Sequence, residues 1–142
     1  MIGIDIAKQY IGLEEVKDGQ EITYLLSTMA HNKDIVVVPS VTSWCAAWIN
    51  FCERSVGNPG TGLLNAQSFN NYGTEINPDD SQEGDIIVFH FPSDSEWQGH
   101  VTYLHKWDDE NNMVECLGGN QQNSVKYSAY NQDHIRHIRR FK

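Results

Sequence analysis

Several features are scarce in this sequence, and each scarcity excludes a class of protein. The 142 residues include three cysteines, an odd number that does not suggest a disulfide framework. No CxxC motif or paired Cys and His spacing predicts a structural zinc site. No apolar run approaches the roughly 18 residues that a transmembrane helix needs. The remaining composition, 39% hydrophobic and 20% charged, is that of an ordinary globular domain.

Basic residues are also scarce, because 10 Lys and Arg stand against 19 Asp and Glu, which gives a net charge of −9. This balance argues against nucleic acid as the main partner, since phosphate contacts need clustered Lys and Arg. The one basic cluster lies at the C-terminus and comprises Arg136, Arg139, Arg140 and Lys142. We expect this cluster to be a solvated tail.

Residues 1–8 lack the basic start and apolar block of a secretion signal. We therefore expect a protein that is synthesised in the cytoplasm and that would need a separate delivery route to act outside it. The length fits a single domain over residues 1–142, and a domain of this size can bury a substantial core.

Hydrophobic spacing predicts helices in the first half of the chain. Amphipathic helices are expected over residues 5–16 and 21–29, followed by an irregular stretch at 31–40. The clearest helix begins after a cap at Thr42 or Ser43 and ends near Gly57. One further helix is predicted within residues 62–72, in a region rich in loops.

The second half of the chain has the pattern of short strands. They are predicted at residues 85–89, 100–104, 113–117, 124–127 and 134–138, with a polar turn at 107–112. Helices that precede a meander of strands favour the α+β class, with the N-terminal helices packed on an antiparallel β-sheet.

Cys45 is the candidate nucleophile among the three cysteines. It is expected two or three residues into its helix, where free N–H groups and the helix dipole lower the pKa of a thiol. Cys52 lies two turns further along and Cys116 falls in a predicted strand, so neither gains this effect. The alternative for Cys45 is a small buried side chain on the apolar face of the helix.

A cysteine nucleophile needs a base, and His100 is the best placed of the six histidines. It follows Gly99 and opens a predicted strand, so it is exposed yet held on a rigid element. His90, at the end of the preceding strand, is the reserve candidate, whereas His134 and His137 lie among arginines and are expected at the surface.

A hairpin argument selects a third group. If the strands at 100–104 and 113–120 pair about a turn near residue 110, His100 faces Asn120, which would hold the second ring nitrogen of the imidazole. In the same register Glu115 faces His105, too far along the strand to contact His100. A slip of one residue would change these pairings. The alternative for Asn120 is a turn residue after Gly118 and Gly119.

These residues resemble the NlpC/P60–CHAP superfamily of papain-like cell-wall cysteine hydrolases, and most closely a small CHAP-like branch common in phages and prophages. The resemblance covers nearly the whole chain, in the order AKQYIGLEE (7–15), SWCAAWIN (43–50), residues 61–73, EGDIIVF (83–89), GHVTY (99–103) and LGGNQ (117–121). The chain departs from the family in Ser43, where proline is frequent, and in Thr102, where a small residue is frequent.

The resemblance implies a papain-like NlpC/P60-type fold and hydrolysis of an amide bond in peptidoglycan through an acyl-enzyme. Cys45 would attack, His100 would transfer the proton, Asn120 would orient His100, and the Cys45 N–H would be an oxyanion donor. Trp44, Trp97 and Gln121 would contact the substrate, although Trp44 is equally compatible with core packing. No cofactor or metal is implied as essential.

Some CHAP domains bind calcium, and four nearby carboxylates permit it here: Asp79, Asp80, Glu83 and Asp85. They lack the ordered spacing of a known calcium loop, so a solvated acidic loop is the expectation, with Asp85 anchoring its own strand. Glu115 is an uncertain fourth member of the site.

The resemblance leaves the cleaved bond open between an endopeptidase and an N-acetylmuramoyl-L-alanine amidase. A phage endolysin or a secreted effector with an immunity protein would both fit, with peptidoglycan as the partner and neither nucleic acid nor membrane bound. The alternatives are an inert module of the same fold that binds the cell wall or a protein, and a cysteine hydrolase that acts on protein or small amides inside the cell.

Overall fold

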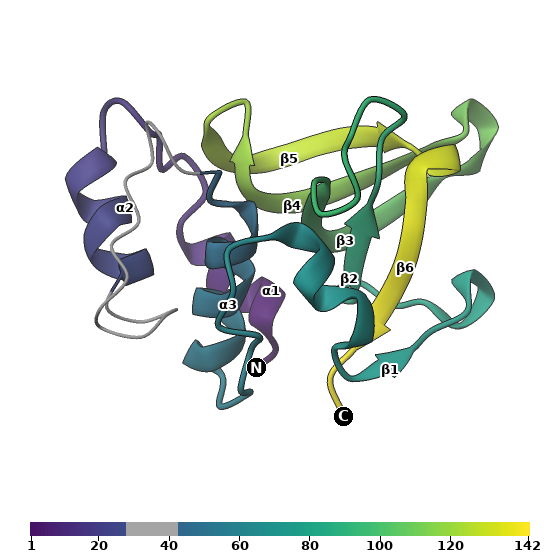
Figure 1. Ribbon diagram of the computed structural model, residues 1–142, viewed down its shortest axis with the longest axis horizontal. Coiled ribbons are helices and arrows are strands. Elements are labelled where there is room, and N and C mark those ends of the chain that lie inside the picture. Colours follow the sequence, from purple (N-terminus) through teal and green to yellow (C-terminus); the bar gives the residue numbers. More distant parts are fainter. Residues whose placement is uncertain (28–42) are drawn as a thin grey trace.

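The computed structural model describes residues 1–27 and 43–142 (Figure 1). Within these residues the α-helices are α1 (Gly3–Gln9), α2 (Gly19–Leu25) and α3 (Cys45–Ser55). The strands are β1 (Thr74–Glu75), β2 (Ile86–Phe89), β3 (His100–Asp108), β4 (Met113–Gln121), β5 (Ser124–Asn131) and β6 (Ile135–Arg140). Short 3-10 turns connect them: η2 (Ala66–Asn71), η3 (Pro78–Asp80), η4 (Asp109–Asn111) and η5 (Gln132–His134).

The strands form one antiparallel sheet in the order β1-β6-β2-β3-β4-β5. The helices come first in the chain and lie together on one side of the sheet (Figure 1). The predicted α+β class, with N-terminal helices on an antiparallel sheet, is therefore confirmed.

The residues of β2 contribute to hydrophobic clusters on both faces of the sheet. All four of its residues are buried, and they alternate between two hydrophobic clusters. Ile86 and Val88 join the core under the helices, whereas Ile87 and Phe89 join a smaller core on the opposite face, because successive side chains of a strand point to opposite sides.

α3 is the central helix of the larger core. Its residues from Cys45 through Glu53 are all buried, so burial in this helix is not confined to one apolar face. It is enclosed between α1 and strands β3 and β4. Gly119 allows this close approach, because a Cβ atom there would lie 2.7 Å from the rings of Trp44 and Trp48.

The boundaries of several elements differ from the prediction. The first helix spans Gly3–Gln9 and ends well before residue 16, since the chain turns at Gly12 with a φ of +102°. No side chain caps α3, whose N-cap is Trp44, so the predicted cap at Ser43 is wrong. The alternative cap Thr42, the irregular stretch 31–40 and the end of the second predicted helix lie outside the described residues.

The prediction of a solvated basic tail is wrong for three of its four residues. Arg136, Arg139 and Arg140 belong to β6, an inner strand between β1 and β2. Arg140 pairs with the buried carboxylate of Asp85 through Nε and Oδ1 at 2.6 Å, and Arg139 donates to the carbonyl oxygens of Tyr72 and Gly73. Asp85 anchors its strand locally as expected, because it accepts from the Gln82 backbone N–H, but its ion pair with Arg140 is a long-range contact that sequence patterns do not reveal.

Candidate functional site

Cys45 is the first residue of α3, and its side chain is 2% exposed. The N–H groups of the first helical turn have no partner within the helix, so the thiol lies where the helix dipole favours negative charge. Cys45 stands one or two positions nearer the helix start than the sequence predicted. Cys52 and Cys116 are buried elsewhere in the two cores, and burial raises the pKa of both thiols.

His100 is the first residue of β3 and is brought against Cys45 by the packing of α3 on the sheet. The preceding Gly99 has a φ of +147°, and a Cβ atom there would clash with the carbonyl oxygen of Phe89. A glycine is therefore required immediately before the histidine. Gln67 of η2 also secures this turn, because its Nε2 donates to the carbonyl oxygens of Phe89 and Gln98.

The two side chains change each other's acidity. Burial alone raises the pKa of the Cys45 thiol, but the hydrogen bond and charge of His100, with weaker hydrogen bonds from the Val101 backbone and Ser43, bring the pKa below its usual value. Burial alone lowers the pKa of His100, but Cys45 and then Gln121 raise it above its usual value. The lowered pKa of Cys45 and the raised pKa of His100 both favour a thiolate beside an imidazolium.

Gln121 at the end of β4 holds the other side of the His100 ring. Its Oε1 is 3.0 Å from His100 Nε2 and also accepts a hydrogen bond of 2.8 Å from the Thr102 hydroxyl. Its Nε2 donates to two backbone carbonyl oxygens, those of Cys116 at 3.2 Å and Lys126 at 2.6 Å. Gln121 is 1% exposed, so these bonds are made without competition from solvent.

The bonds of Gln121 determine which imidazole nitrogen carries a proton. A flipped amide would set its oxygen against two carbonyl oxygens, so Oε1 must face His100. An amide oxygen accepts hydrogen bonds and donates none, so His100 Nε2 carries its hydrogen and donates it. Nδ1 is then the nitrogen available to exchange a proton with Cys45.

The prediction that Asn120 contacts His100 is wrong, and the cause is local. The β3–β4 register is as predicted at Tyr103↔Leu117, where the residue numbers sum to 220. Beyond this pair β4 bulges between Gly118 and Gln121, and Asn120 adopts a φ of 58°. The bulge advances the strand by one residue, so Gln121 occupies the place predicted for Asn120. The Asn120 amide instead donates to the Ser43 hydroxyl at 3.4 Å.

Three further candidates lie away from this pair. Glu115 pairs with Lys106 across the strands, so the predicted pairing with His105 is wrong, although Glu115 Oε1 lies 3.6 Å from His105 Nε2; Glu115 does not join the site. His90 Nε2 lies 3.0 Å from the carbonyl oxygen of Ser95 and has no described contact with Cys45. Trp44 is fully buried and donates from Nε1 to Glu15, so its predicted contact with substrate is wrong. Gln121 is likewise too buried to be the substrate contact that was predicted.

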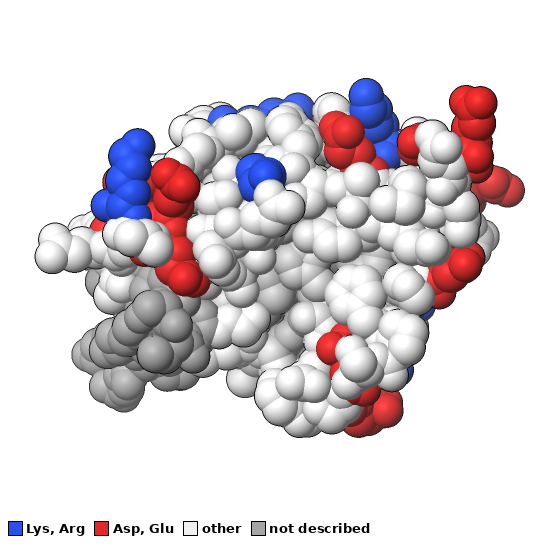
Figure 2. Space-filling model, turned by 90° about the horizontal axis from the view of Figure 1, so that it is seen from above, with Lys and Arg blue, Asp and Glu red and all other residues white. Residues whose placement is uncertain are grey.

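A cavity of about 220 Å³ opens beside Cys45. It is lined by residues 64–66, by Ser43 and Cys45, and by Asp94, Trp97, Gln98 and Gly99 of the loop before β3. Trp97 is 63% exposed, as expected of a side chain that could contact substrate. Asp94 is the one acidic or basic side chain among the described residues that line this cavity. Seen from above, the molecule is hollowed near its middle, and the atoms next to the hollow are mostly uncharged (Figure 2).

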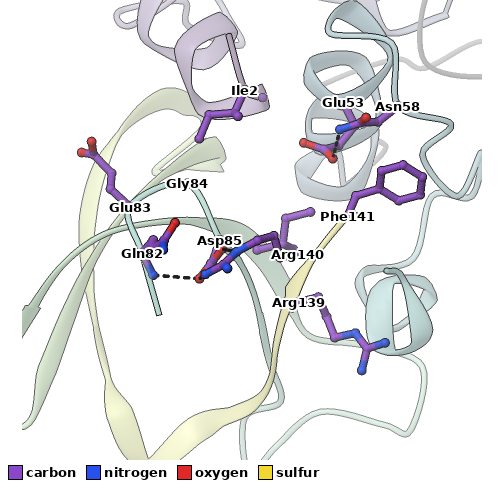
Figure 3. Close-up of a pocket in the computed structure, with 12 residues that line it drawn as sticks. Ile2, Glu53, Asn58, Gln82, Glu83, Gly84, Asp85, Arg139, Arg140 and Phe141 are labelled. Atoms are coloured by element: carbon purple, nitrogen blue, oxygen red, sulfur yellow. Dashed lines mark hydrogen bonds and ion pairs between the residues drawn. The ribbon is translucent and has the colours of Figure 1, made fainter. Parts of the chain in front are cut away.

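A second cavity, of about 150 Å³, lies near the other end of α3 (Figure 3). Its wall includes Glu53, eight residues or roughly 12 Å along the helix from Cys45. The Glu53 carboxylate accepts hydrogen bonds from Tyr72, Tyr103 and Asn58. Asp85 in the same wall is paired with Arg140. Glu53 is thus occupied by contacts that include one from α3 to β3, and Asp85 by its ion pair with β6, so the cavity near Cys45 is the better functional candidate.

No protein-family model matches this chain, and no curated protein is significantly similar to it. Among residues 1–27 and 43–142, no group of three or more His, Cys, Asp or Glu side chains is arranged to hold a metal ion. In the same residues no helix has both the length and the apolarity needed to cross a bilayer. The functional argument therefore depends on the geometry around Cys45.

Proposed function

We propose that this protein is a cysteine hydrolase of papain-like layout that cleaves an amide bond in peptidoglycan. One observation carries the chemistry. The Cys45 thiol at the start of α3 is hydrogen-bonded to His100, and the other ring nitrogen of His100 is hydrogen-bonded to the buried amide of Gln121. This combination supplies a nucleophile, its proton acceptor and an orienting group. The arrangement supports a Cys45–His100–Gln121 site in place of the Cys-His-Asn site that the sequence indicated.

In this mechanism the Cys45 thiolate attacks the amide carbonyl carbon. The tetrahedral intermediate places its oxygen toward the free N–H groups at the start of α3, where that of Cys45 would be one donor. The Nδ1 proton of His100 passes to the leaving nitrogen, the C–N bond breaks, and a thioester remains on Cys45. Water then attacks the thioester while Nδ1 accepts one of its protons, and the acid product leaves as the thiolate re-forms.

The choice of peptidoglycan comes from the sequence resemblance, and the cavity beside Cys45 adds a preference in charge. Asp94 places a carboxylate in that cavity, and its Oδ2 accepts from the Phe91 backbone N–H. The exposed ring of Trp97 lies in the same wall. A carboxylate beside an aromatic ring favours an uncharged or amine-bearing portion of a stem peptide over a carboxylate-bearing one.

Action on peptidoglycan would place the protein at the bacterial cell wall after release or delivery. An endolysin freed at lysis and an injected effector with a cognate immunity protein both agree with this proposal. The two origins share the same chemistry, and the bond that is cleaved distinguishes an endopeptidase from an N-acetylmuramoyl-L-alanine amidase.

The decisive test is digestion of purified peptidoglycan by the wild type and by Cys45→Ala, followed by mass spectrometry of the soluble products. We expect fragments from the wild type alone, and their masses identify the bond. Cys52→Ala is the matched control, because that thiol lies on the same helix but not beside His100, and it should retain activity. If a folded wild type releases nothing from walls of several chemistries, the hydrolase proposal fails and an inert wall-binding or protein-binding module becomes the better explanation.

A further inference from the structure

Tyr130 on β5 contacts the proposed base from a side that the mechanism above does not use. Its phenol oxygen is 3.2 Å from His100 Nε2, and the two ring centroids are 5.1 Å apart at an angle of 40°. The ring of Phe89, whose centroid is 5.0 Å from that of Tyr130, packs against it from β2. The tyrosine is thus held beside the imidazole by strands at different positions in the sheet.

The hydrogen on His100 Nε2 has two possible acceptors. Gln121 Oε1 at 3.0 Å is the nearer, and the Tyr130 oxygen at 3.2 Å is the second. Burial, reinforced by nearby thiol charge, raises the pKa of the Tyr130 phenol, so it stays protonated and neutral. The Ser128 side chain, two residues earlier on β5, is within hydrogen-bonding reach of the same phenol. The phenol can therefore accept from His100 without titrating itself.

We propose that Tyr130 is a positioning residue that favours the imidazolium form of His100 as a second acceptor for its Nε2 hydrogen. Ionisation of the pair moves one proton from Cys45 Sγ to His100 Nδ1, while the Nε2 hydrogen and the Tyr130 hydroxyl keep theirs. A charged N–H is a stronger donor than a neutral one, so both acceptors stabilise the product of this transfer more than its starting state. The nearby aromatic face acts in the same direction.

This inference deepens the proposed function, since it rests on the Cys45–His100 pair, but its test needs no substrate. The rate of Cys45 alkylation by iodoacetamide is measured against pH in the full chain, with the modified peptide resolved by mass spectrometry. Tyr130→Phe keeps the ring and removes the acceptor, whereas Tyr130→Leu removes both. Tyr127→Phe is the matched control, because this tyrosine is on the same strand but packs against His105, with ring centroids 4.7 Å apart.

We expect the ionisation constant of Cys45 to fall about fivefold in Tyr130→Phe, further in Tyr130→Leu, and to be unchanged in Tyr127→Phe. A merely structural role would lower the denaturation midpoint without moving the ionisation of the thiol. The two acceptors share one hydrogen, so each compensates in part when the other is removed. The ionisation constant of Cys45 should therefore fall by a larger factor in the double variant Tyr130→Phe, Gln121→Ala than the product of the two single factors.

The inference is overturned if Tyr130→Phe has the same alkylation profile as the wild type, or if the wild-type thiol itself shows no lowered pKa. Its failure is distinct from failure of the proposed function. A lowered thiol pKa that depends on Tyr130, in a protein that cleaves no amide, sustains the inference and refutes the hydrolase. If the protein cleaves amides and Tyr130→Phe has the alkylation profile of the wild type, the hydrolase proposal stands and the inference about Tyr130 is refuted.

Discussion

Replacement of Gln121 tests whether the bulge in β4 has changed the identity of the third residue of the site. Gln121→Ala removes four hydrogen bonds of 2.6 to 3.2 Å: to His100, Thr102 and the carbonyl oxygens of Cys116 and Lys126. The bond to the imidazolium is charge-assisted and worth about 1.5–3 kcal/mol, which corresponds to a loss of roughly 10- to 150-fold in the rate of amide hydrolysis. The groups left without partners should lower the free energy of unfolding by about 2–4 kcal/mol.

Two further variants separate geometry from stability. Gln121→Asn keeps the amide but is one methylene shorter, so it cannot span from the carbonyl oxygens to His100 and should behave like Gln121→Ala. Asn120→Gly is the control, because Asn120 has a φ of 58° that glycine adopts without strain. It should retain activity within about twofold, since its one described side-chain bond, to Ser43, is long.

The assays are hydrolysis of a soluble peptidoglycan fragment and the alkylation of Cys45 against pH, with the denaturant midpoint measured for each variant. The reasoning is refuted if Asn120→Gly abolishes activity while Gln121→Ala, under conditions where it is folded, retains both activity and a reactive thiol. That pattern would mean that Asn120 orients His100 and that the amide of Gln121 only stabilises the packing of β4 against β5.

Three other consequences can be measured directly. Activity should require the Cys45 thiolate and the His100 imidazolium together, so it should rise with pH through a lowered thiol pKa and fall through a raised histidine pKa. The folded protein gains stability from Cys45 above its lowered pKa and from His100 below its raised pKa, and loses each contribution when pH passes those limits. A flat pH–activity profile would contradict the coupled pair. Gly119→Ala should cost about 1–3 kcal/mol of unfolding free energy in denaturant melts, because its Cβ meets two tryptophan rings, whereas Gly19→Ala, with open space around it, should change stability by less than about 0.5 kcal/mol. Equal midpoints would refute the close packing of α3 on β4. Asp94→Asn should lower the ratio of Cys45 modification rates by aminoethyl and sulfonatoethyl methanethiosulfonate by roughly threefold to tenfold, and an unchanged ratio would show that Asp94 does not set the charge of the cavity.

The fold could be predicted where local patterns were sufficient. The order of helices before strands, the strand at β2 and the turn between β3 and β4 all follow from apolar spacing and polar interruptions. The C-terminal arginines could not be placed in the same way. Their pairing with Asp85 and with backbone carbonyls depends on β6 entering the sheet between β1 and β2, a long-range choice that the local charge of the segment does not encode.

The two best-positioned residues of the site have local signals in the sequence. Cys45 begins a helix, and His100 begins a strand behind a glycine whose φ of +147° only a residue without a side chain tolerates well. Tyr130 has no such signal, because its contact with His100 spans 30 residues and crosses the sheet. Gln121 was predicted to contact substrate because its motif indicates that it lies near the site. The motif does not indicate to which side of the strand its side chain points.

The sequence by itself determined the α+β class, the identity of the candidate nucleophile and base, and the register of β3 and β4 at Tyr103↔Leu117 and Leu104↔Cys116. Only the tertiary structure decided that Gln121 holds the histidine and that Asn120 does not. The physical reason is that side chains alternate along a strand, so one bulged residue exchanges the two faces. Whether a bulge forms depends on the fit of Gly119 against Trp44 and Trp48, on the close approach of Gly118 to Thr102, and on the hydrogen bond that Gln121 donates to the Lys126 carbonyl of β5, and these contacts exist only once the chain has folded.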